Sequence, residues 1–113
     1  MAETIHQLKL TIQEWIRSAQ TESDPDTYLG KRLLPRYAPW CAPLDLRADG
    51  RTINAQGRDI CVGGVGFTCK QEFPRGTVIE MRPHGSEVWI PIRVRHSTAT
   101  VSGYKIGARF VFE

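Results

Sequence analysis

The sequence predicts a mainly β protein: a six-stranded antiparallel β-barrel preceded by one amphipathic α-helix. Apolar residues recur with helical spacing only near the N-terminus, whereas from about residue 40 onward they alternate with polar residues, which is the period of a β-strand. Clusters of Gly, Pro, Asp and Ser separate the alternating runs. No long apolar stretch remains for a buried helix there, and short antiparallel strands close readily into a barrel because closure removes exposed edges.

The N-terminal segment, residues 1–21, carries an apolar stripe at helical spacing. The residues of this stripe are Ile5, Leu8, Ile12, Trp15, Ile16 and Ala19. The stripe predicts a helix that docks on the barrel or forms a homodimer through Trp15 and Ile16. A membrane anchor is disfavoured, because the polar face of the helix is slightly acidic.

A connector is expected over residues 22–39, which contain Pro25, Gly30, Pro35 and Pro39 and have no sustained periodicity. Loops held by a rigid scaffold often carry binding residues. The connector therefore separates the helix from a barrel over residues 40–113.

Six strands are expected in the barrel, near residues 40–48, 51–60, 64–70, 77–82, 87–97 and 103–112. Alternation is clearest in the fifth, where Ile90, Ile92 and Val94 should face inward. Pro91 within that strand is expected to mark a bulge or an edge.

Charge is spread unevenly along the 113 residues, whose formal net charge is +3. Residues 1–30 hold two basic and five acidic side chains, while residues 31–113 hold thirteen basic and seven acidic ones. Most of the basic residues are arginines, which suit planar anions better than lysines do.

Cysteine and histidine spacing gives no sign of a metal site, because the three cysteines form no Cys-x-x-Cys pair and the three histidines complete no ligand spacing. We expect reduced cysteines in a cytoplasmic protein. No apolar run approaches transmembrane length and no signal peptide is visible, so membrane insertion is not expected.

Arg32 and Arg36, on the connector, are the first candidate binding residues. In an extended or a helical segment, side chains four positions apart can reach one ligand. Two guanidinium groups suit phosphates or the acceptor edge of a purine. The alternative is that both arginines pair with carboxylates such as Asp45, Asp49 or Glu113.

The stretch Asp59-Ile-Cys61-Val-Gly-Gly64 is the second candidate. It combines a carboxylate, which can accept from the donor edge of a guanine, with a glycine turn that admits a close backbone approach. The structural alternative is a hairpin corner in which Asp59 caps backbone amides and Gly63, Gly64 and Gly66 permit a bulge or a left-handed turn.

Together the two elements, with 22 residues between Arg36 and Asp59, and the ending Gly103-Tyr-Lys-Ile-Gly-Ala-Arg-Phe110 resemble the PilZ family over residues 31–113. The resemblance implies a PilZ-type barrel and a bacterial receptor for cyclic di-GMP.

In such a receptor, Arg32 and Arg36 would engage the phosphates and guanines of the nucleotide. Asp59 would accept from guanine N1 and N2, Gly64 would admit the ligand to the backbone, and Lys31 would assist. The resemblance further implies recognition without catalysis, no cofactor besides the ligand, and relay to an unidentified protein partner in motility or biofilm regulation.

Cys61 stands where the family signature has serine. A thiol is a weak hydrogen-bond donor, and the loss of one neutral hydrogen bond costs about 0.5–1.5 kcal/mol. The alternative function is therefore a PilZ-like protein–protein interaction module that binds cyclic di-GMP weakly or not at all. Nucleic acid is the least favoured partner, because only one outward aromatic residue, Trp89, accompanies the outward arginines.

Overall fold

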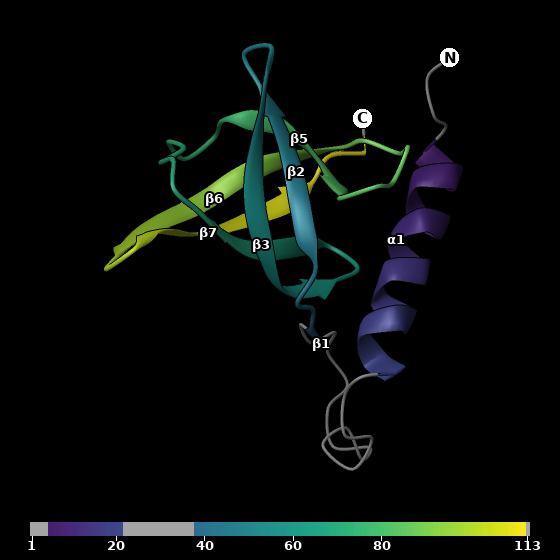
Figure 1. Cartoon of the computed structure of the whole chain (residues 1–113). Coiled ribbons are helices and arrows are strands. Elements are labelled where there is room, and N and C mark those ends of the chain that lie inside the picture. The colour runs from purple at the N-terminus through teal and green to yellow at the C-terminus, as the bar shows by residue number, and fades with distance from the viewer. Residues whose placement is uncertain (1–4, 22–37, 113) are drawn as a thin grey trace.

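The computed structural model describes residues 5–21 and 38–112 (Figure 1). These residues form one helix and seven strands in the order α1 (Ile5–Thr21), β1 (Ala38–Pro39), β2 (Pro43–Ala48), β3 (Arg51–Cys61), β4 (Gly64–Cys69), β5 (Val78–Pro83), β6 (Ile90–Thr100) and β7 (Gly103–Phe110).

Six of the strands close into an antiparallel barrel. Their order is β3-β2-β5-β6-β7-β4, and the pairing of β4 with β3 closes the circle. The short strand β1 pairs with the end of β3, where Ala38 lies opposite Ile60 and Pro39 opposite Asp59. The predicted six-stranded antiparallel barrel with an N-terminal helix is confirmed, and β1 occupies the last two residues of the expected connector.

The barrel interior is filled by alternating apolar side chains, as the sequence predicts. On β6, Ile90, Ile92 and Val94 are buried, and on β7 so are Ile106 and Ala108. The other large buried core residues include Leu44, Leu46, Ile60, Val65, Phe67, Ile79 and Met81. Close packing of this kind is the main stabilising contribution in a domain of this size.

Helix α1 lies along one side of the barrel (Figure 1), and side chains of its apolar stripe contact the barrel core. Leu8 and Ile12 are buried in the same cluster as the barrel interior. One turn further on, the indole of Trp15 stacks on that of Trp40, with ring centroids 5.7 Å apart. The described side chains of the stripe, those of Leu8, Ile12, Trp15 and Ile16, therefore pack within the chain. Within the described residues, no helix is long and apolar enough to cross a membrane.

Two local features differ from the expected pattern. The first barrel strand starts at Pro43 because the chain turns before it: the amide of Ala42 donates to the carbonyl of Trp40. Pro91 is the second residue of β6 and not the bulge. Its carbonyl accepts from Val111, so its backbone groups face away from β5 and its missing N–H removes no bond to that strand.

Candidate functional site

The second sequence motif forms the hairpin that joins β3 to β4. Asp59 and Cys61 lie on the outer face of the barrel, because Ile60 between them is fully buried. Gly64 is buried and lies opposite both Cys61 on β3 and Arg109 on β7. The predicted corner is therefore present, with the candidate carboxylate and thiol on one exposed surface.

The thiol of Cys61 holds the turn of this hairpin. The amide of Gly63 donates to its sulfur at 3.4 Å, so sulfur occupies the place of a side-chain oxygen that accepts from a turn. Sulfur is a weak acceptor, and this bond is weaker than its oxygen counterpart. No positive φ occurs at Gly63, Gly64 or Gly66, so the expected left-handed turn is not formed.

A β-bulge lies one residue before Asp59. The pairing of β3 with β4 shifts register between Gly57 and Asp59, so Arg58 has no partner of its own. Gly57 and Ile60 are both buried, and the two residues between them face outward. The bulge thus places Arg58 and Asp59 side by side on the surface. The bulge therefore lies before Asp59 and not among the glycines after it, where the sequence permits a bulge or a left-handed turn.

Asp59 is the first member of a row that crosses four strands. It lies opposite Gly66 on β4, Gly66 lies opposite Gly107 on β7, and Gly107 lies opposite His96 on β6. A Cβ atom on Gly66 would collide with the Asp59 carboxylate, and one on Gly107 would collide with the His96 imidazole. Both polar side chains therefore lean inward over the glycine pair and face each other across it.

Two shallow hollows, each of about 360 Å³, adjoin this row. His96 and Gly107 line both of them, so the two hollows meet there. The first includes Asp59 and Gly66 and is also lined by Arg58, Val65, Phe67, Lys105 and Ile106. The second includes Cys61 and is also lined by Gly63, Arg95, Ala108 and Arg109.

The surface around the row carries an excess of unpaired positive charge. Arg58, Arg95, Lys105 and Arg109 are all exposed. In the described part of the chain, none of them forms an ion pair with a carboxylate. Among the described residues, Asp59 is the one acidic residue that lines either hollow. Such a surface favours a ligand with anionic groups and one hydrogen-bond donor edge.

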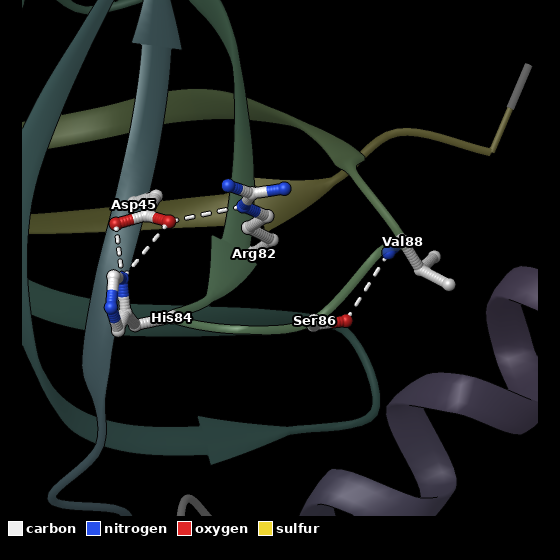
Figure 2. Close-up of polar contacts among 5 residues, drawn as sticks. All are labelled: Asp45, Arg82, His84, Ser86 and Val88. Atoms are coloured by element: carbon white, nitrogen blue, oxygen red, sulfur yellow. Dashed lines mark hydrogen bonds and ion pairs between the residues drawn. The ribbon is translucent and has the colours of Figure 1, made fainter.

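On the opposite side of the barrel, charged side chains of β2 and β5 pair with one another; Figure 2 shows the contacts of Asp45. The buried carboxylate of Asp45 on β2 accepts from Arg82 at 3.0 Å and contacts Nδ1 of His84 at 3.2 Å. On the same strands Arg47 pairs with Glu80 at 2.8 Å. Both of these arginines also stack on Trp89, at 4.2 and 4.3 Å from its ring centroid.

Burial by itself raises the pKa of Asp45, but the hydrogen bonds and positive charges of His84 and Arg82 outweigh it. The net result is a pKa below the ordinary value. The Asp45 carboxylate thus already has two partners. This argues against the alternative in which Asp45 pairs with Arg32 or Arg36.

Of the residues predicted to bind, the structure brings together Asp59, Cys61 and Gly64. Lys31, Arg32 and Arg36 lie outside the described residues. The described chain resumes at β1, and Trp40, which follows this strand, donates its amide to the carbonyl of Arg58 at 2.8 Å. Among the described side chains, no three His, Cys, Asp or Glu gather as a metal-binding group.

The sequence analysis did not single out Arg58 or His96, and it placed Arg95 on the outer face only as part of the least favoured, nucleic-acid-binding surface. A signal was present, because each strand contains two consecutive polar residues that interrupt its alternation, Arg58-Asp59 on β3 and Arg95-His96 on β6. Such an interruption is typical of a bulge. No family model matches this chain, and no curated protein matches it.

Proposed function

We propose that this chain is a PilZ-type domain that binds cyclic di-GMP and relays the binding to a protein partner. The observation that carries the proposal is the row in which Asp59 faces His96 across Gly66 and Gly107, on a surface whose basic side chains form no ion pair within the described residues. A carboxylate suits the N1 and N2 donors of guanine, and the surrounding cations suit phosphates.

The connector arginines complete the proposed site. Arg36 precedes Ala38 by two residues, and Ala38 lies opposite Ile60, between Asp59 and Cys61. The described chain thus resumes, at Ala38, beside this corner. Arg36 and Arg32 would then grip the phosphates and guanines, with Lys31 beside them. This role is binding alone, without catalysis and without a cofactor.

The route to a partner would run through β1. Pro39 lies opposite Asp59, and the next residue, Trp40, stacks on Trp15 of α1. A nucleotide bound between the connector arginines and this corner would therefore act on the same few residues that hold the helix. We expect the partner to bind α1 and the adjoining barrel surface. The chain would then act as an adaptor in the bacterial cytoplasm.

Isothermal titration of cyclic di-GMP into the intact chain tests the proposal. We expect saturable binding that is lost in Arg32→Ala/Arg36→Ala and in Asp59→Ala. The matched control is Arg51→Ala/Arg75→Ala, which removes two exposed arginines that line neither hollow and should leave the affinity unchanged.

Absence of binding by the unmodified chain, with an unchanged melting temperature in the presence of ligand, would reject the receptor function. It would favour the alternative of a nucleotide-independent interaction module. The observation that supports this alternative is the weak hydrogen bond from the Gly63 amide to the Cys61 sulfur, because it shows a thiol at the position of the signature serine.

A further inference from the structure

Strand β6 contains a second bulge that the signature residues do not explain. Its alternation buries Ile90, Ile92 and Val94, and a regular strand would bury His96 next. The pairing with β7 instead shifts register between Val94 and His96, so Arg95 is the extra residue. Arg95 and His96 are both exposed as a result. Bulges are enriched next to binding sites, where they redirect side chains.

The two bulges lie on either side of the same pair of glycines. On β3 the bulge turns Arg58 and Asp59 outward, and on β6 it turns Arg95 and His96 outward. Gly66 and Gly107 occupy the two strands between them. Each bulge therefore supplies one arginine and one polar side chain that leans over a glycine.

The half of this surface around β6 is chemically distinct from the half around Asp59. Its hollow is lined by Arg95, His96 and Arg109, together with Cys61 of the signature corner. Within the described ranges, no carboxylate lines this hollow and neither arginine forms an ion pair.

A pair of like charges lies at the edge of this hollow. Arg93 lies directly opposite Arg109 on β6 and β7, an arrangement of like charges that destabilises a sheet. The same barrel neutralises Arg47 and Arg82 with carboxylates on β2 and β5. Cations that gather without carboxylate partners in a hollow, although their repulsion destabilises the sheet, are typical of an anion-binding site.

We propose that the β6 hollow is the phosphate-binding half of the nucleotide site, with Arg95 and His96 as its ligand-contacting residues. The assignment rests on the proposed function, since it presupposes a nucleotide whose guanine faces Asp59. A phosphate seated in this hollow beside His96 accepts from the Arg95 guanidinium and from the His96 ring. Arg109 adds a second positive charge on the side of Cys61.

The test is calorimetric titration of cyclic di-GMP into the intact chain and into Arg95→Ala, His96→Ala and His96→Gln. We expect Arg95→Ala and His96→Ala each to weaken binding about 10- to 100-fold, the range for a hydrogen bond to a charged group. His96→Gln keeps a side-chain donor and should restore part of the loss. The matched control is Arg75→Ala, an exposed arginine that lines neither hollow and should change the affinity less than about twofold.

A spectroscopic readout separates the phosphate contact from a general structural role. In ¹⁵N-labelled protein, GMP should shift the Arg95 Nε–H and His96 ring signals, whereas guanosine, which has no phosphate, should leave them in place. Melting temperatures of the variants within a few degrees of the unmodified chain would show that the barrel is intact.

The outcomes are distinguishable. Tight binding by the unmodified chain with unchanged affinity in both alanine variants would overturn this assignment and leave the proposed function standing. Equal shifts with GMP and guanosine would also overturn it. No binding by the unmodified chain would overturn the proposed function and this assignment together.

Discussion

The indole rings of Trp15 and Trp40 stack at a centroid distance of 5.7 Å with 18° between their planes. Trp40 is buried and immediately follows β1, whereas Trp15 comes from the middle of α1. This pair joins the helix to the point where the chain enters the barrel.

Removal of either ring should loosen the helix. We expect Trp40→Ala to lower the free energy of unfolding by about 3–5 kcal/mol, the usual cost for a large buried aromatic residue. In a double-mutant cycle with Trp15→Ala, the coupling between the rings should be about 0.5–1.5 kcal/mol. Urea denaturation measures both, and Leu10→Ala, an exposed position on the same helix, should change stability by less than about 0.5 kcal/mol. Additive single mutants would show that the stacking contributes nothing.

Stability should fall in acid because of Asp45. Its pKa lies below the ordinary value in the folded state, so its contribution is fully present above the ordinary value and is lost as pH falls through the folded value. Asp45→Asn should cost about 1.5–3 kcal/mol at pH 7, since Arg82 and His84 lose a charged acceptor.

The measurement is the urea midpoint of the unmodified chain and of Asp45→Asn between pH 7 and pH 2. The difference between the two should shrink as the pH drops. Glu80→Gln is the matched control, because it breaks an exposed ion pair on the same strands and should cost less than about 0.5 kcal/mol. A constant difference across the whole pH range would contradict the assignment to the Asp45 carboxylate.

Cys61→Ser should tighten cyclic di-GMP binding. A serine hydroxyl accepts from the Gly63 amide more strongly than sulfur does and can also donate to the ligand. One neutral hydrogen bond corresponds to a gain of about 0.5–1.5 kcal/mol, or roughly 2- to 10-fold in affinity. Calorimetry compares it with Cys41→Ser, an exposed cysteine that lines neither hollow and should have no effect. Equal or poorer affinity of the Cys61 variant would count against serine-like binding at this corner.

Local patterns predicted the barrel well because strand alternation is a local property. Ile90, Ile92 and Val94 are buried as expected, and so is Ile60, which leaves Asp59 and Cys61 on the outer face. The period of two places residues on a face without knowledge of their neighbours.

The rest of the site depends on which strands meet and in which register. Gly66, Gly107 and His96 come from three different strands, and closure of the barrel aligns them with Asp59. Alternation alone would place His96 inside, next to Val94. The bulge reverses this orientation, and the position of a bulge is fixed by pairing between strands, not by the period of one strand.

Repulsion between Arg93 and Arg109 should lower the stability of the barrel. They lie directly opposite each other, and in the described part of the chain no carboxylate pairs with either. Arg93→Glu should raise the free energy of unfolding by about 0.2–1 kcal/mol, since it replaces a like-charge pair by an opposite-charge pair. Arg93→Gln removes the repulsion alone and should give a smaller gain, and added salt should reduce both. Urea denaturation of Arg93→Glu without any gain would show that the two side chains splay apart.

The glycines beneath Asp59 and His96 should matter for binding more than for folding. An added Cβ on Gly66 or Gly107 meets the far end of an exposed or half-buried side chain, which can rotate away. We expect Gly66→Ala and Gly107→Ala to change the free energy of unfolding by less than about 1 kcal/mol and to weaken cyclic di-GMP binding at least tenfold, because Asp59 or His96 is turned from the ligand.

Gly57→Ala is the contrasting variant: its Cβ would lie 2.7 Å from the backbone carbonyl of Trp40, which is tied to β3 and cannot rotate, so this change should destabilise the barrel strongly. Calorimetry and urea denaturation of the three variants separate the two effects, and full affinity in Gly107→Ala would show that His96 does not act from its position over Gly107.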